Sequence, residues 1–254
     1  MNDYILNAIN CGFLNKDNIS FSLMHSEFKK QKQGVHDQLK WGRAIISSVD
    51  QLNQYLHSYG DMTKKQWKEI FGKFLFKPDF LQIIDYGCGQ GLASASLFDE
   101  YGKDLRVNTK SVTLIEPSAL ALRRAEAIVR CYCPESSVFS LNDFVGRVKF
   151  ENLNLIPGVE FAHIFSNVLD IPGFDGLSIF RKILKTRGVH NIFAVSHDRN
   201  FFGGSRVFDE IIKIIDDSFH VGVDYKDIYK FKIIVSGKDA DMIGLFCQLE
   251  VLGE

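Results

Sequence analysis

The sequence predicts an α/β fold in which helices cover both faces of a doubly wound, mostly parallel sheet of seven strands. From residue 81 onward, apolar segments with strand character alternate with amphipathic helical segments. A glycine-rich turn, 86–91, directly follows the first strand, and a polar turn typical of a hairpin, 236–239, joins the last two. Such alternation indicates parallel strands joined by crossover helices.

Each element after residue 80 is predicted from its apolar pattern and its end signals. The first strand ends at Asp85, and the helix that begins at Leu92 is expected to end at Gly102. The other predicted elements are, in order, a strand 111–115, a helix to about 129, strands 138–141, 161–165 and 191–195, a helix 207–217, and strands at about 229–235 and 242–252.

Residues 1–78 are expected to form a helical extension, and residues 79–254 a Rossmann-like sheet domain. The first 80 residues contain one proline, Pro78, which stands just before the first strand. Two interpretations of the extension remain open. It packs on the sheet as an ordinary cover, or it is a lid that closes a ligand site and helps to shape a substrate pocket.

Two helices are predicted within this extension. Apolar residues between 39 and 59 recur at steps of three and four, and this helix is expected to end at Gly60. A second helix is predicted to begin at Thr63, with Gln66 as its capping-box partner. Each helix has an apolar face that needs a surface to cover.

The composition sets limits on the function. A length of 254 residues allows one α/β domain or two small ones, and the net charge of -1 produces no strong overall attraction to a polyanion. The first ten residues lack a basic region, and no apolar segment approaches the roughly 18 residues of a membrane span. We therefore expect a cytoplasmic protein without a membrane partner. The odd number of cysteines, five, predicts free thiols and no metal site.

The glycine-rich turn is the strongest indication of a ligand. Its pattern is Asp85-x-Gly87-x-Gly89-x-Gly91. Because glycine has no Cβ, a ligand can lie against bare backbone amides at the start of the following helix. A dinucleotide-binding turn has two residues between its last two glycines, so the spacing here fits nicotinamide cofactors poorly.

This turn resembles the first motif of class I S-adenosylmethionine-dependent methyltransferases. The resemblance implies that the turn 87–91, which includes Cys88, packs against the methionine part of the cofactor. It also implies that Asp85 helps to hold the ammonium group. The alternative is an ordinary glycine loop between a strand and a helix.

Two further positions fit cofactor binding. Glu116 ends the second strand, where this architecture binds a ribose, because a carboxylate can accept from both hydroxyls. Its placement is similar to the family's second motif, and the alternative is an acid at a helix N-terminus. After the third strand come Asn142 and Asp143, which the resemblance places beside the adenine and which equally suit an Asx turn.

The ends of the fourth and fifth strands are expected to face the substrate, because ligands bind beyond the carboxyl ends of such strands. Ser166 is assigned to the cofactor site, and Asn167, Asp170 and His197 are the candidate catalytic residues. The unperturbed pKa of a histidine side chain lies near neutrality, so His197 suits a general base. The alternatives are turn caps and a solvated histidine.

The segment from Asn167 also bears on the acceptor. It reads Asn-Val-Leu-Asp, whereas methyltransferases of exocyclic base amines commonly carry Asn-Pro-Pro-aromatic here. The Pro-Cys nucleophile of carbon-5 cytosine enzymes is absent as well. A DNA base is therefore a disfavoured acceptor.

Basic residues of the extension suggest two further roles. Arg43 could grip the carboxylate of a bound amino-acid moiety, although a surface arginine is the alternative. Residues 1–80 hold 11 Lys and Arg against 8 Asp and Glu, so their lysine clusters could contact RNA phosphates or simply be solvated.

The resemblance covers residues 80–254 and implies a seven-stranded sheet whose last strand is antiparallel. It implies an S-adenosylmethionine-dependent methyltransferase with an unidentified acceptor, which is a small molecule, a protein or RNA. Two alternatives stay open: an enzyme directed at RNA or the ribosome, and a protein that binds S-adenosylmethionine without catalysis.

Overall fold

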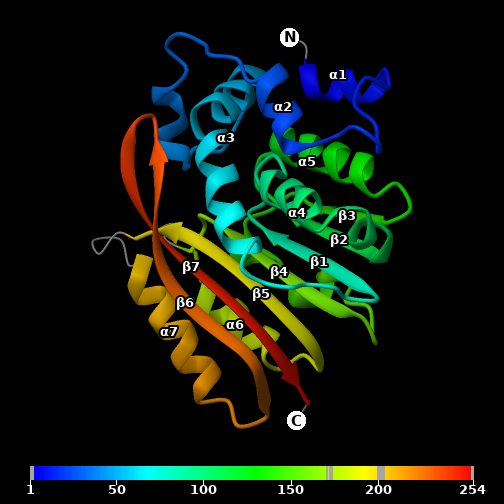
Figure 1. The fold of residues 1–254 in the computed structure, drawn as a ribbon, viewed down its shortest axis with the longest axis vertical. Helices are drawn as coiled ribbons and strands as arrows, with labels where there is room; N and C mark the ends of the chain where they lie inside the picture. The colour runs from blue at the N-terminus through cyan, green and yellow to red at the C-terminus, as the bar shows by residue number, and fades with distance from the viewer. Residues whose placement is uncertain (1–2, 170, 172–173, 199–203, 253–254) are drawn as a thin grey trace.

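The computed structural model describes residues 3–169, 171, 174–198 and 204–252. These residues build a seven-stranded sheet in the order β3-β2-β1-β4-β5-β7-β6 (Figure 1). β1 to β5 are parallel, and β7 runs antiparallel to both β5 and β6. The predicted fold class is confirmed, including the antiparallel last strand and the N-terminal helices. The strands are β1 Leu81–Tyr86, β2 Thr109–Ile115, β3 Ser137–Leu141, β4 Glu160–Ser166, β5 Gly188–His197, β6 Val221–Val235 and β7 Lys238–Val251.

Helices lie on both faces of the sheet (Figure 1). One face carries α3, α4 and α5, whose apolar side chains join a core cluster with β1, β2 and β5, and the other carries α6 and α7. The α-helices are α1 Tyr4–Asn10, α2 Phe21–Phe28, α3 Val49–Phe71, α4 Leu92–Asn108, α5 Ala119–Tyr132, α6 Gly176–Ile183 and α7 Gly204–Asp216. Three short 3₁₀ segments are η1 Asp37–Gly42, η2 Val145–Arg147 and η3 Phe150–Leu153. Within the described residues, no helix combines the length and apolar character that crossing a bilayer requires.

The two helices predicted in the extension are one helix, α3, so the predicted break between Gly60 and Thr63 is wrong. Gly60 lies inside the helix, and a larger residue would collide with α2 there: a Cβ would be 2.6 Å from His25 Cδ2. Thr63 caps nothing, since its hydroxyl donates to Tyr59 O at 3.0 Å. The helix begins after Ser48, which is its N-cap: the Ser48 hydroxyl accepts from the backbone N–H of Gln51 at 3.2 Å.

The predicted end of a helix at Gly102 is partly correct. Gly102 has φ 70° and interrupts the helical backbone, but the chain turns helical again and α4 continues to Asn108. The residue therefore makes a kink, which only glycine adopts at low cost.

α3 crosses the sheet and covers β5 and β7. Phe71 packs edge-on against Phe193 of β5, with ring centroids 5.3 Å apart. Gly244 of β7 lets Ile70 approach so closely that a Cβ there would lie 2.4 Å from its Cδ1. The N-terminal helices thus share a hydrophobic core with the sheet, and they bring the extension to the carboxyl ends of the strands.

Candidate functional site

A cavity of about 400 Å³ opens beyond the carboxyl ends of the parallel strands. Seven of the residues singled out in the sequence line it: Arg43, Gly87, Gly89, Glu116, Ser166, Asn167 and His197. Five others do not: Asp85, Cys88, Gly91, Asn142 and Asp143. Asp170 lies outside the described residues. The tertiary structure therefore gathers residues from four strand ends and from the N-terminal extension around one space.

Gly87, Gly89 and Gly91 of the turn have different structural roles, although each has a positive φ. A Cβ on Gly87 would lie 2.6 Å from Val168 Cγ1, and one on Gly91 would lie 3.0 Å from Ala125 Cα. These two glycines permit close packing of the protein on itself. A Cβ on Gly89 would have no neighbour within 4 Å, and Gly89 lines the cavity. Only this glycine keeps space open for a ligand.

The side chains of Cys88, within the turn, and of Asp85, just before it, are buried. Burial raises the pKa of the Cys88 thiol well above its usual range, so the thiol is protonated and unreactive at neutral pH. Asp85 is fully buried and accepts from Ser94 Oγ at 2.7 Å through one carboxylate oxygen, while its Oδ1 has no partner among the described residues. Burial raises the pKa of Asp85 to about 7.

Glu116 ties the glycine turn to the end of β2. Its Oε2 accepts from the backbone N–H of Gly89 at 3.1 Å, and its Oε1 accepts from the N–H of Ser118 at 2.8 Å. Burial raises the pKa of Glu116, and these two hydrogen bonds partly offset that effect. Because each carboxylate oxygen has two acceptor sites, Glu116 can still accept from two hydroxyl groups in the cavity.

Asn142 and Asp143 are engaged in local contacts after β3. The Asn142 side chain donates to the backbone oxygens of Glu116 and Pro117 at 2.9 and 3.0 Å, and Asp143 Oδ1 accepts from the N–H of Phe144 at 2.8 Å. The next residue along, Phe144, reaches the cavity instead. These contacts shape the segment that presents an aromatic ring to the cavity.

The end of β4 is held by α3. Trp67 Nε1 donates to Ser166 Oγ at 3.0 Å. Asn167 and Gln66 pair their amides reciprocally at 3.0 and 2.9 Å, and Asn167 has a left-handed φ of 54°. Gln66, predicted as a capping residue, is instead fully buried against the strand end. His197, at the end of β5, lines the same cavity.

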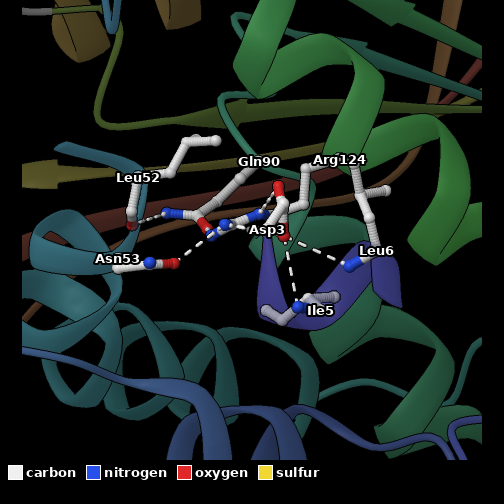
Figure 2. A network of polar contacts seen from close by, with 7 residues as sticks. All are labelled: Asp3, Ile5, Leu6, Leu52, Asn53, Gln90 and Arg124. Carbon is white, nitrogen blue, oxygen red and sulfur yellow. Dashed lines mark hydrogen bonds and ion pairs between the residues drawn. The ribbon is translucent and has the colours of Figure 1, made fainter. Parts of the chain in front are cut away.

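A buried arginine joins the turn to the extension (Figure 2). Arg124 on α5 is fully buried; its guanidinium donates to Gln90 Oε1 at 2.8 Å, to Asn53 Oδ1 at 2.9 Å and to Asp3 Oδ2 at 2.9 Å. Gln90 belongs to the glycine turn, and its amide also donates to Leu52 O at 3.2 Å. Sequence reasoning missed this network, because no local pattern indicates that these segments meet.

Other lining residues were not predicted from the sequence either. They come from the segment before α3, from α3 itself, and from loops after the strands, and they are mostly apolar: Trp41, Ala44, Ile45, Ile46, Tyr55, Tyr59, Met62, Val145, Val168, Ile171, Phe174 and Val235. The amphipathic pattern of α3 was the only signal, since it required a surface for the apolar face.

Comparison with known proteins finds solved structures that are similar to this chain in fold. Solved methyltransferase structures resemble this chain. They include M. jannaschii TYW2 in complex with AdoMet (14% identity over 82% of this chain and 86% of that chain, TM-score 0.48) and a SAM-dependent methyltransferase from Leishmania major (14%, 89% and 91%, 0.45). An rRNA methylase from Streptococcus thermophilus is similar too (14%, 76% and 96%, 0.43). No protein-family model matches the sequence, and no curated protein is similar to it in sequence. At 14% identity the likeness concerns the fold alone.

Proposed function

We propose that this protein is an S-adenosylmethionine-dependent methyltransferase. One observation carries the proposal: Gly89 opens onto the cavity with no atom where its Cβ would be, and the Glu116 carboxylate accepts from that glycine's own N–H at 3.1 Å. A bare turn next to a half-buried carboxylate suits a ligand that combines an amino-acid chain with a ribose. It does not suit a pyrophosphate, which a carboxylate at this place would repel.

Different residues of the cavity would bind different parts of the cofactor. Glu116 would accept from the ribose hydroxyls, and the turn at Gly87 and Gly89 would cradle the methionine chain. Phe144 would cover the adenine face, and Arg43 would bind the carboxylate of the methionine part. Asp85 lies below the turn, so its buried carboxylate would act on the ammonium group from beneath.

When bound, S-adenosylmethionine supplies an electrophilic methyl group, which bonds to an acceptor atom that gives up a proton, while the carbon–sulfur electron pair stays with the sulfur. The protein's contribution is positioning and the exclusion of water, which for well-oriented reactions amounts to about 7 to 11 kcal/mol. The apolar lining excludes water, Asn167 is fixed by Gln66, and His197 is the candidate to take the proton. Asp170 stays a second candidate base.

We further propose that residues 1–78 form a cover over the site and that residues 79–254 form the cofactor-binding domain. Support comes from the lining of the cavity, to which the segment before α3 contributes Arg43 and α3 contributes Tyr59 and Met62. The cover would select the acceptor, and the sheet would position the methyl group.

Calorimetry tests the function directly. Wild-type protein should bind S-adenosylmethionine and S-adenosylhomocysteine, and Gly89→Val should abolish binding because its side chain fills the cavity. Gly158→Val is the matched control, since Gly158 also has a positive φ and open space but lies away from the cavity. It should bind normally after any loss of stability is accounted for. A wild-type protein that binds NAD and neither sulfur compound would contradict the proposal.

A further inference from the structure

The wall that the extension adds to the cavity has a distinct chemistry. Over the whole cavity, the described lining residues include one basic residue, Arg43, and one acidic residue, Glu116, and Glu116 is engaged with the glycine turn. The part contributed by the segment before α3 and by α3 is dominated by large rings and aliphatic chains. Apart from Arg43, this wall has no charged side chain among the described lining residues, so it favours an apolar ligand, because a charged group placed away from Arg43 would lose its hydration without a partner.

Trp41 is displayed at this wall by an unusual backbone. Lys40, Trp41 and Gly42 have consecutive positive φ angles of 47°, 61° and 85°. For residues with a side chain this conformation costs about 1–3 kcal/mol each. The turn is closed by a hydrogen bond from the N–H of Ala44 to the oxygen of the buried Leu39 at 3.1 Å. The result is that the Trp41 ring lines the cavity while 84% of the residue stays exposed.

A second ring, Tyr59 of α3, lies below the same turn. Its orientation is fixed by Tyr55, at 4.9 Å between ring centroids, and by His36, which stacks at 6.4 Å. A Cβ on Gly42 would touch both tyrosine rings, at 3.7 and 3.9 Å, so the turn that displays Trp41 rests on them. Burial raises the pKa of Tyr59, which keeps its hydroxyl protonated as a donor.

We propose that Trp41 and Tyr59 form the binding site for the methyl acceptor and that this acceptor is a planar aromatic ring. The inference rests on the proposed function and deepens it by naming the substrate class. A ring stacked on an aromatic side chain gains about 1–3 kcal/mol, and Trp41 presents an exposed ring on the cavity for such stacking. His197, on the same cavity, would take the proton from the ring's oxygen or nitrogen as the methyl group arrives.

Tryptophan fluorescence tests the site without measuring activity. The chain has two tryptophans, and Trp67 is fully buried, so a probe in the cavity should quench mainly Trp41. With S-adenosylhomocysteine present, 4-hydroxybenzoate and guanosine should quench it, whereas 4-hydroxycyclohexanecarboxylate, which has the same charge without a planar ring, should not. The same titrations without S-adenosylhomocysteine show whether ring binding stands even if the cofactor assignment fails.

Variants separate stacking from general packing. Trp41→Ala should weaken binding of the planar probes, measured by calorimetry, by about 5-fold to 150-fold, and Trp41→Phe should restore most of it. Affinity for S-adenosylhomocysteine should be unchanged in both. Phe13→Ala, which removes an exposed ring outside the cavity, is the control and should change nothing.

Each remaining outcome bears on the proposal. Tighter, salt-dependent binding of a guanine-containing oligonucleotide than of guanosine would support the ring site and assign it to RNA, and equal binding would assign it to a small molecule. Equal affinity for the planar and the saturated probe would overturn the proposal. So would preferential binding of tetramethylammonium, which indicates a cation cage, or the absence of binding by any planar probe up to its solubility limit.

Discussion

At the scale of single residues, Glu116 has two roles that a sequence pattern does not separate. Its carboxylate organises the glycine turn through the N–H of Gly89 and accepts from the N–H of Ser118, the residue that caps the start of α5. It also lines the cavity, where it is the one acidic residue among the described lining residues. The helix-start interpretation and the ribose interpretation are therefore compatible.

Glu116→Ala should weaken binding of S-adenosylhomocysteine by more than tenfold, because a charged acceptor contributes roughly 1.5–3 kcal/mol. Glu116→Gln keeps one acceptor oxygen and should lose less. Calorimetry measures both affinities, and Glu135→Ala, on the exposed surface, is the control for removing an acid. Unchanged affinity in a folded Glu116→Ala protein would leave the residue as a helix-start acid only.

At the scale of elements, α3 is the helix that connects the N-terminal segment to the carboxyl ends of the strands, where the cavity lies. It carries Gln66 and Trp67, which hold the end of β4, and Tyr59, which lines the cavity. The reciprocal amide pair uses one donor and one acceptor on each side, so neither Gln66 nor Asn167 can change partner without leaving a buried polar group unpaired.

Breaking this pair should lower the free energy of unfolding, and the loss should be larger when the other amide remains in place. Asn167→Gly keeps the left-handed backbone but removes the Asn167 amide that pairs with the buried Gln66 side chain. The free energy of unfolding, measured with urea, should fall by about 1–3 kcal/mol. Gln66→Met together with Asn167→Gly should recover part of this loss, because no buried amide then remains. Purely additive effects of the two changes would argue against a coupled pair.

In addition, we expect Asn167→Ala to slow methyl transfer while cofactor affinity changes little.

At the scale of the whole molecule, a buried hydrogen-bonded chain crosses three strands. His190 Nε2 must donate to Thr186 O at 2.7 Å, because a carbonyl only accepts. His163 Nε2 then donates to His190 Nδ1 at 2.9 Å, and Tyr86 donates to His163 Nδ1 at 3.1 Å. Both histidines are thus neutral, and burial lowers the pKa of His163 well below its usual value and that of His190 to about 4.

Stability should therefore fall as pH falls. In the unfolded chain the histidines take up protons below pH 6.5, whereas in the native state they resist until much lower pH. The stabilisation is complete above pH 6.5 and is lost as pH falls toward 4, by roughly 3 kcal/mol for His190 alone. Urea unfolding between pH 7.5 and 4.5 measures the loss.

A variant isolates the histidines from other groups that titrate in this range. The pKa of Asp85, raised to about 7, acts in the opposite direction, because its native state holds a proton that the unfolded state releases. His163→Phe with His190→Phe should flatten the acid-side loss relative to the wild type. An equal loss in this double variant would show that other groups cause it.

What the sequence determined by itself depends on neighbours along the chain. The alternation of strands and helices, the glycine turn and the acid after β2 were all predictable, since period, capping and turn chemistry are local. Local signals also misled: Gly60 read as a helix end, although it is a packing contact with α2. Six predicted site residues line one cavity because parallel strands all end at the same edge of the sheet, and Arg43 joins them from the N-terminal segment.

What only the tertiary structure decided was which distant segments meet. Arg124 gathers Asp3, Asn53 and Gln90, and Asn167 pairs with Gln66, a residue 101 positions away. These partners are chosen by how α1, α3 and α5 pack on the sheet, and a buried charge or amide accepts any geometrically suitable partner, so no spacing in the sequence encodes them. The same packing puts Trp41 at the mouth of the cavity, which the sequence alone gives no reason to expect.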